Sequence, residues 1–455
     1  MKNINLKLMV DLIDNVKTEE IFGWPQTDTY NIMKYVYNGN NDGSNRFGYG
    51  FFPRLLDQNN INYEYINSIK SNLQTSDKKW IYLMDVTGGP DTWFGSNPNS
   101  LLSGVSDNVL AGVRDNNGII VLYASYEGFD PIRFDIFKNI KKELEDKKIP
   151  LANFCYVTGD QKSSFTYKEW CEANNIKDKF HVICYNDEEA VPFYKNRIND
   201  RRFNCFKRED ISVKPEKYFL CYNRRPHVHR MALAALLEKY NLIEDGLISF
   251  PDSTFSEGFP GEAELNEKLE NLIDPNTQPY GWELIDGNED TKKDILHYWN
   301  KFEKRLPLLV DIDTLDDNLW ERFDIIPYKK TFFSIVVETL FHGNTIFLDE
   351  KIWKAIEARH PFVFVGNYHG LKKLKKLGYK TFHPHINEEY DDIKGPGDRM
   401  FKIVKEIKRL TSLSFSEWES LLKTIDPVLD YNVRWKEKRS VVGIDNFIKE
   451  VDSQR

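Results

Sequence analysis

The segment from Phe332 to Gly366 constrains the fold of this chain more strongly than any other. An apolar run over residues 333–337 ends in Glu338, and a second apolar run follows over residues 361–365. Between them, the acidic-basic pair Glu350-Lys351 opens a stretch long enough for a short helix. A buried strand, a helix and a second buried strand in this order predict neighbouring strands of a parallel sheet. The segment therefore predicts an α/β layer fold.

The first 210 residues repeat the same alternation of short apolar runs and longer polar segments. The runs predict buried strands over residues 80–84, 118–123, 153–157 and 180–184. Segments of helical length lie between them, such as 131–147 and 167–175. Carboxylates follow several of the strands, and the carboxyl ends of parallel strands are where α/β folds bind ligands.

A charged, proline-containing stretch over residues 201–216 predicts a linker between two domains. After it, a new strand (217–222), a helix (231–240) and a strand (246–250) start a second α/β unit. The periodic segments 399–410 and 416–425 predict a helical end. We therefore predict an N-terminal α/β domain over residues 1–210. The predicted C-terminal α/β domain spans residues 217–455, with a largely helical insertion over residues 251–331.

Composition describes a globular chain that is large enough for two or three domains. The 455 residues carry a net charge of -8, which argues weakly against a surface that binds nucleic acid all over. Five scattered cysteines without C-x-x-C spacing predict reduced thiols. No signal peptide and no apolar run long enough to span a bilayer are evident, so we expect a cytoplasmic protein without a membrane span.

A turn rich in arginine follows the strand predicted over residues 217–222. It contains Arg224, Arg225 and Arg230, the last near the start of the next helix. Guanidinium groups and free N–H groups at a helix start can hold a diphosphate. A solvated basic loop is the alternative, but Lys351 in the same predicted domain favours phosphate binding.

The stretch around Glu350-Lys351 resembles the donor-binding half of the α1,3-fucosyltransferases. In that family a serine and a glutamate on one strand precede a (I/V)-T-E-K helix start and a strand led by proline. The matching positions are Ser334, Glu338, residues 348–351 and Pro361, with Asp349 where the family has threonine. Residues 378–391 also resemble an L-G-[FY]-x-T-F and D-E-x-Y-D pattern of phage and bacterial glycosyltransferase-like proteins, which extends the resemblance to residues 217–395.

These resemblances imply a glycosyltransferase of the GT-B type. Such an enzyme has two Rossmann-like α/β domains that face a cleft, with the acceptor on the N-terminal domain and a nucleoside-diphosphate sugar on the other. It needs no cofactor beyond this co-substrate, because cationic side chains and a helix end neutralise the leaving diphosphate without a metal. Both retaining and inverting chemistry remain open, as do transfer of a hexose and of a pentose.

The resemblance and the charge pattern together nominate the site residues. The predicted donor-binding residues are Arg224, Arg230, Ser334, Glu338, Glu350 and Lys351. For the catalytic base, Glu127 is the first candidate, because the neighbouring Gly128 permits close approach of a ligand. Its alternative role is a turn carboxylate that caps the helix near Pro131. The other carboxylates that follow predicted strands are Asp85, Asp91, Asp130 and Asp160.

Metal-binding patterns are incomplete in this sequence. The H-x-H pairs are His227 with His229 and His383 with His385, and neither has a third ligand at a recognisable spacing. The D-x-D pair Asp311-Ile312-Asp313 lies in an acidic, loop-rich region without a clear strand before it. We therefore predict no metal site.

The acceptor is the least constrained part of the prediction. The resemblance to phage proteins implies that the acceptor is hydroxymethylated viral DNA or a glycan, and that the protein works in the host cytoplasm. The basic stretch 195–208 could contact DNA, although a solvated hinge explains it as well. Four lysines of the helix predicted over residues 371–377 lie opposite a leucine face and are expected to be solvated. The alternatives are a non-catalytic viral protein that binds nucleic acid or carbohydrate, and a nucleotide-sugar epimerase, whose Gly-rich turn and Tyr-x-x-x-Lys pair are not evident.

Overall fold

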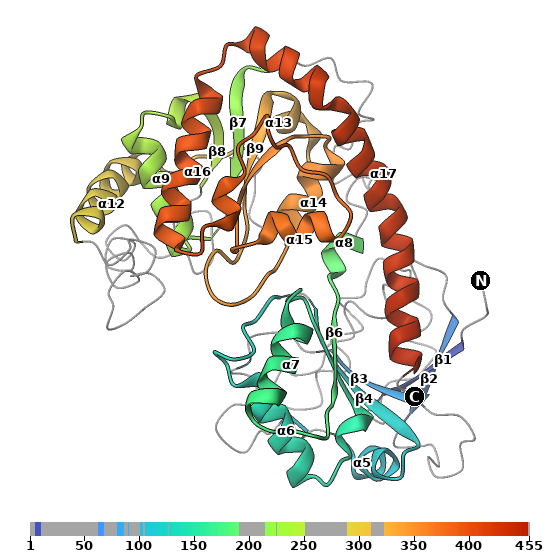
Figure 1. Ribbon diagram of the computed structural model, residues 1–455. Helices are drawn as coiled ribbons and strands as arrows, with labels where there is room; N and C mark the ends of the chain where they lie inside the picture. The colour runs from blue at the N-terminus through green and yellow to red at the C-terminus, as the bar shows by residue number, and fades with distance from the viewer. Residues whose placement is uncertain are drawn as a thin grey trace. The chain divides into compact units, whose positions relative to one another are not determined.

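The computed structural model describes residues 5–10, 62–67, 80–85, 90, 101–102 and 105–190, then 214–250, 289–310 and 323–453. Within these ranges, Tyr126 and Arg224 lie outside the described residues. The chain forms two compact units (Figure 1): unit 1 comprises residues 1–190 and 439–455, and unit 2 comprises residues 191–438. The following paragraphs take each unit by itself.

The described residues of unit 1 form a six-stranded, wholly parallel sheet in the order β2-β1-β3-β4-β5-β6. Its strands are β1 (Asn5–Val10), β2 (Asn62–Asn67), β3 (Trp80–Asp85), β4 (Gly118–Ala124), β5 (Phe154–Thr158) and β6 (His181–Cys184). Its helices include α5 (Asp107–Arg114), α6 (Ile136–Asp146), α7 (Ser163–Ala173) and the short α8 (Asp187–Ala190). Every residue of β4 and β5 is buried, as expected where helices cover both faces of a parallel sheet.

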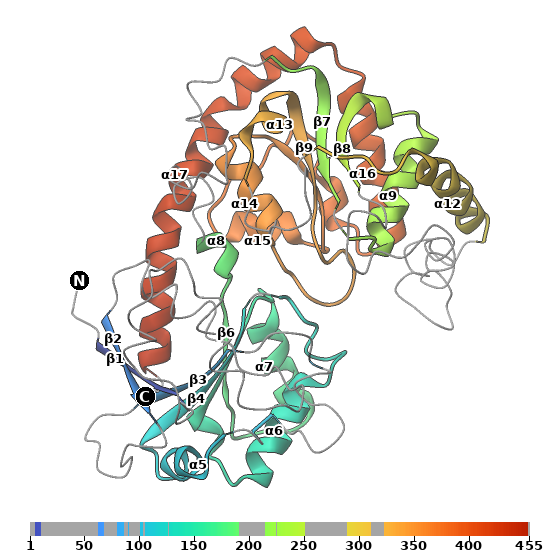
Figure 2. The same ribbon diagram turned by 180° about the vertical axis from the view of Figure 1, so that it is seen from behind.

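In unit 2, the part of the chain that the structure describes forms a four-stranded parallel sheet in the order β10-β9-β7-β8. Its strands are β7 (Lys217–Tyr222), β8 (Gly246–Ser249), β9 (Thr331–Val337) and β10 (Phe362–Val365). The helices around it (Figures 1 and 2) are α9 (Val228–Lys239), α12 (Glu289–Phe302), α13 (Ile325–Lys329), α14 (Glu350–Glu357), α15 (Gly370–Lys376) and α16 (Pro396–Thr411). Helix α14 packs on β9, and α16 packs on β10.

The long helix α17 (Phe415–Ser453) contributes to both units. Its residues up to Lys438 count with unit 2, and those from Arg439 onward count with unit 1. The division therefore differs from the predicted domains, which placed all residues after 217 together. Pro427 and Gly443 of α17 lie away from residues 438–439, so no helix-breaking residue marks the change of unit there. Most of the linker predicted over residues 201–216 lies outside the described part of the chain, which omits residues 191–213.

The predicted fold class is confirmed: the chain is α/β, with two Rossmann-like parallel-sheet units and a helical C-terminal end. The strands predicted from apolar runs are all present within one or two residues of their predicted bounds. Strands β1 and β2 were not predicted. Within the insertion predicted over residues 251–331, the described part is largely helical. No helix among the described residues combines the length and apolar character that crossing a bilayer requires.

Candidate functional site

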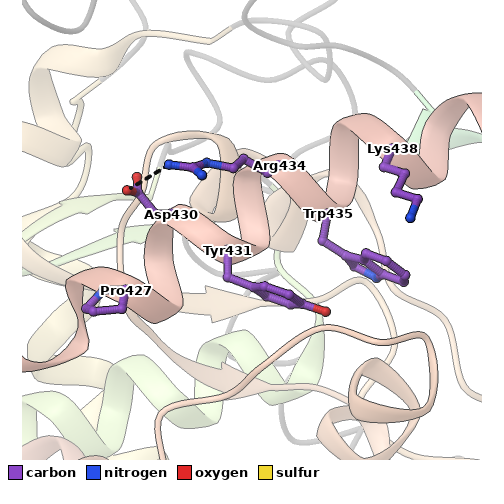
Figure 3. A pocket seen from close by; sticks show the side chains of 6 residues that line it. All are labelled: Pro427, Asp430, Tyr431, Arg434, Trp435 and Lys438. Carbon is purple, nitrogen blue, oxygen red and sulfur yellow. Dashed lines mark hydrogen bonds and ion pairs between the residues drawn. The ribbon is translucent and has the colours of Figure 1, made fainter.

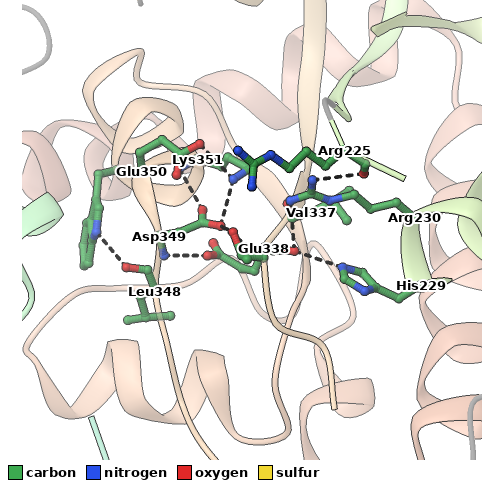
Figure 4. A network of polar contacts seen from close by, with 11 residues as sticks. Arg225, His229, Arg230, Val337, Glu338, Leu348, Asp349, Glu350 and Lys351 are labelled. Atoms are coloured by element: carbon green, nitrogen blue, oxygen red, sulfur yellow. Dashed lines mark hydrogen bonds and ion pairs between the residues drawn. The ribbon is translucent and has the colours of Figure 1, made fainter. Parts of the chain in front are cut away.

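The order of strands in unit 2 defines one position at its carboxyl edge. The chain runs from β7 outward to β8, then returns to place β9 on the other side of β7. The carboxyl ends of β7 and β9 are therefore the point where the direction of the connections reverses. Open parallel sheets bind ligands at such a switch point. The residues that follow these two strands form the candidate site shown in Figure 4.

Hydrogen bonds of the Glu338 and Asp349 side chains join the two ends of the loop that follows β9. Glu338 is 0% exposed, and its Oε2 accepts the main-chain N–H of Asp349 at 2.5 Å. Asp349 accepts in turn from the N–H of Thr339 at 2.7 Å and from its hydroxyl at 2.9 Å. Asp349 also caps α14 by accepting from the N–H of Lys351 at 3.0 Å. These contacts fix the start of α14 beside the end of β9.

The ammonium group of Lys351 contacts the carboxylates of Asp349 and Glu350. Its Nζ is 2.8 Å from a carboxylate oxygen of Asp349 and 2.8 Å from one of Glu350. The Lys351 side chain is 16% exposed and that of Glu350 is 14% exposed. Both can therefore be reached from solvent, whereas Asp349 lies beneath them at 1%.

Two residues at the start of α9 hold the end of β9 from the other side. Arg230 is 3% exposed, and its guanidinium donates to main-chain carbonyls of Arg225, Val337 and Glu338 at 3.3 to 3.5 Å. His229 Nε2 lies 3.0 Å from the Glu338 carbonyl, which can only accept, so this nitrogen carries a proton. The positive charge of Arg230 therefore lies near Glu338, but its guanidinium donates no hydrogen bond to a carboxylate among the described residues.

Burial and neighbouring charges set the ionisation of the cluster. Burial, followed by the Asp349 carboxylate, raises the pKa of Glu338 well above its ordinary value. Burial alone would raise the pKa of Asp349, but the Lys351 ammonium and its hydrogen bonds lower that pKa below the ordinary range. Burial alone would lower the pKa of Lys351, yet Asp349 and Glu350 raise it. Burial holds the pKa of His229 well below its usual range, so this imidazole is neutral.

The other two residues predicted for the donor site have different outcomes. Ser334 is 4% exposed in the middle of β9, and its Oγ lies 2.7 Å from His360 Nδ1. His360 Nε2 donates to the Thr331 carbonyl at 2.9 Å. The Ser334 hydroxyl therefore contributes to an internal network rather than to the carboxyl edge.

Arg224 lies outside the described residues. The neighbouring Arg225, in the turn between β7 and α9, is described and exposed. In the view of Figure 4 its side chain extends toward Glu350 and Lys351.

In unit 1, Glu127 lies in the turn after β4 and is partly exposed. The helix predicted near Pro131 begins at Ile136, and residues 131–135 form a turn, where Asp130 Oδ1 accepts from the N–H groups of Ile132 and Arg133 at 3.0 and 3.1 Å. Asp160 is fully buried, and its Oδ1 accepts from the Lys162 N–H at 3.0 Å. Asp85 ends β3, and Asp91 lies outside the described residues.

Neither H-x-H pair belongs to a group of three or more potential metal ligands among the described residues. His227 and His229 stack with ring centroids 5.8 Å apart, and His229 stacks on Phe341 at 5.6 Å. His383 and His385 are exposed in a loop. No group of three or more potential ligands occurs among the described residues. Asp311 and Asp313 lie outside them.

The pattern over residues 378–391 has a structural role in unit 2. Glu388 accepts from the N–H groups of Phe382 and His383 at 2.7 and 3.1 Å, and Tyr390 Oη accepts from the N–H of Phe364 in β10 at 3.1 Å. Asp391 accepts from the N–H groups of Leu371 and Lys372, which begin α15. The lysines of α15 lie mostly on its exposed face, as predicted. This segment therefore fixes β10 and α15.

A hollow of about 390 Å³ lies along α17 (Figure 3). Pro427, Asp430, Tyr431, Arg434, Trp435 and Lys438 line it. The Tyr431 hydroxyl donates to the Gly378 carbonyl at 3.0 Å, and Trp435 Nε1 donates to the Leu377 carbonyl at 2.9 Å. Gly378 has φ +93°, and a Cβ there would lie 2.6 Å from the Trp435 ring. The two rings thus anchor α17 to the end of α15.

Comparison with known proteins adds little to this description. No protein-family profile matches the chain, and no curated protein matches it. Among solved structures, it is similar to a UDP-forming α,α-trehalose-phosphate synthase from Burkholderia vietnamiensis, with 9% identity and a TM-score of 0.38 over 76% of this chain and 70% of that one. An α,α-trehalose 6-phosphate synthase from Burkholderia multivorans gives 9% identity and a TM-score of 0.39 over 88% and 75%. A UDP-forming synthase from Burkholderia xenovorans gives 9% and 0.37 over 82% and 73%. Scores this low decide neither the fold nor the activity.

Proposed function

We propose that unit 2 binds a nucleoside-diphosphate sugar and that the chain is a glycosyltransferase. One observation carries this proposal: Arg225, Arg230 and Lys351 gather where the carboxyl ends of β7 and β9 meet the starts of α9 and α14. A diphosphate is the ligand that cations and free helical N–H groups at a switch point bind best. The resemblance of residues 332–366 to the fucosyltransferases supports the same ligand.

In the proposed reaction, an acceptor hydroxyl attacks the anomeric carbon of the donor sugar. The bond between that carbon and the diphosphate oxygen breaks, the nucleoside diphosphate leaves, and the acceptor proton passes to a base. Arg225 and Lys351 would stabilise the charge that develops on the leaving group without a metal ion. Glu350, partly exposed beside Lys351, would accept hydrogen bonds from sugar hydroxyls. Glu338 lies beneath the surface and would act through its neighbours.

Unit 1 would supply the acceptor site and the base. Glu127 after β4 is the proposed base, because its carboxylate is partly exposed at the carboxyl edge of the sheet. In this sheet the connections reverse between β1 and β3, so Asp85 at the end of β3 is the second candidate. The proposed acceptor is a glycan or hydroxymethylated DNA, and the proposed location is the cytoplasm.

Thermal unfolding with a panel of nucleoside diphosphates and nucleotide sugars tests the proposal. We expect at least one nucleoside diphosphate to raise the unfolding temperature, because a ligand that binds only the folded state stabilises it. The rise should persist in EDTA, since arginine and lysine take the place of a metal. A rise that EDTA abolishes would contradict metal independence. If no member of the panel binds, the non-catalytic alternative gains support.

A further inference from the structure

The carboxyl groups of Glu338 and Asp349 are neighbours with very unequal hydrogen bonding. Asp349 accepts from two main-chain N–H groups, from the Thr339 hydroxyl and from the Lys351 ammonium. Glu338 accepts one N–H through Oε2, while its Oε1 is buried and has no partner among the described residues. A buried carboxylate requires several donors to remain ionised, whereas a neutral acid requires far fewer. The geometry thus favours a proton on Glu338.

The surroundings of Glu338 agree with this assignment. At the start of α14 it faces Asp349 and Lys351, with Glu350 paired to Lys351, and at the start of α9 it faces the neutral His229 and Arg230. Gly366, which follows β10, covers the side chain without adding a charge, because a Cβ at this position would lie 3.0 Å from Glu338 Cγ. No solvent reaches Glu338, which is 0% exposed.

The charge balance of the edge depends on this proton. Among the labelled side chains of Figure 4, the cations are Arg225, Arg230 and Lys351, and the carboxyl groups are Glu338, Asp349 and Glu350. With Glu338 ionised, cations and anions would be equal in number. With Glu338 neutral, the cations outnumber the anions, and the edge attracts a phosphate group.

We propose that Glu338 acts in the nucleotide site as a neutral carboxylic acid beside ionised Asp349 and so keeps the edge positive for a diphosphate. This inference rests on the nucleotide site of the proposed function and assigns Glu338 a positioning role there. The proton must be present for tight binding. Because the pKa of Glu338 is raised, affinity should be complete at a pH below that pKa and should be lost as the pH rises through it. Lys351 stays charged over this range, since its own pKa is also raised.

The first experiment asks whether the proton is present in the protein without ligand. An infrared difference spectrum between the parent protein and Glu338→Gln at neutral pH should contain the carbonyl stretch of a buried protonated acid, lost in the variant. Asp349→Asn provides a matched comparison. Without its neighbour's negative charge, Glu338 should lose its proton at lower pH than in the parent. A difference spectrum without an acid carbonyl band overturns the proposal.

The second experiment measures affinity for the nucleoside diphosphate that stabilises the protein most, chosen from UDP, GDP, ADP and CDP. In the parent protein, the dissociation constant should rise by about tenfold per pH unit above the pKa of the carboxyl pair. Glu338→Gln is permanently neutral, so its affinity at neutral pH should stay within about threefold of the parent and should not fall in alkali. Thermal unfolding of the variant verifies that it is folded.

The outcomes separate this inference from the proposed function. If the variant binds more than about tenfold more weakly at neutral pH, an ionised Glu338 is needed and the inference fails while the nucleotide site stands. The same holds if parent and variant lose affinity in alkali alike. If the parent binds none of the four nucleotides, the nucleotide site itself is wrong, and Glu338 has no role in one.

Discussion

Arg225 and Arg230 illustrate how exposure decides what a substitution tests. Arg225→Ala removes an exposed guanidinium, so we expect nucleoside diphosphate affinity to fall about tenfold, as for one lost charged hydrogen bond. Its free energy of unfolding should change by less than about 0.5 kcal/mol. In contrast, Arg230→Ala should lower the free energy of unfolding by about 2 kcal/mol, because it leaves buried carbonyls without donors. Calorimetric titration and urea unfolding measure both effects, with the exposed Lys376→Ala as control. Unchanged affinity in Arg225→Ala and Lys351→Ala would place the diphosphate elsewhere.

Ser334 separates a role implied by resemblance from one given by contacts. Since its hydroxyl is hydrogen-bonded to His360 inside β9, Ser334→Ala should cost about 1 kcal/mol of unfolding free energy. Affinity for the nucleoside diphosphate should remain at the parent value. Urea unfolding and calorimetric titration of the same preparation give the two quantities. A variant with parental stability and weakened binding would restore Ser334 to the donor site.

At the scale of elements, Asp349 decides how α14 begins. Asp349→Ala removes the side chain that caps the helix, so the free energy of unfolding should fall by about 1 kcal/mol or more. Asp349→Thr introduces the residue of the fucosyltransferase pattern and retains a hydroxyl that can cap, so most of this stability should be kept. Urea unfolding of the two variants at neutral pH compares them directly. Equal loss in both would show that the charge, through Lys351, matters more than the cap.

The elements also show how far sequence patterns extend. Buried strands such as β9 were predictable because all seven of their residues are apolar or small. Strands β1 and β2 escaped prediction because NLKLMV and NYEYIN mix polar and apolar residues. In the site, the positions of Arg230 and Lys351 near the starts of α9 and α14 were predictable from the sequence. The burial of the Glu338 and Ser334 side chains was not predictable from the sequence. It depends on which elements pack over β9 in the folded unit.

At the scale of the molecule, the proposed division of labour predicts a separation of binding from turnover. Glu127→Gln conserves volume but cannot take a proton at neutral pH, so transfer should be lost while donor affinity stays at the parent value. A base that acts only in the transition state lowers kcat and kcat/KM together. Steady-state kinetics and calorimetric titration measure the two effects. Unchanged turnover would move the search to Asp85, at the switch between β1 and β3, and to Asp91 and Asp160.

The split composition of unit 1 has a consequence for how the protein is made. Residues 439–453 of α17 belong to this unit, and Arg439 pairs with Glu189 across 250 positions of sequence. On the ribosome, unit 2 is therefore synthesised completely before the last part of unit 1 exists. Domains usually fold in the order in which they emerge. Here unit 1 emerges first, but it cannot complete its fold until unit 2 and the end of α17 have been synthesised. We expect its sheet to assemble early and its final packing to be completed only after synthesis of the helix that closes it.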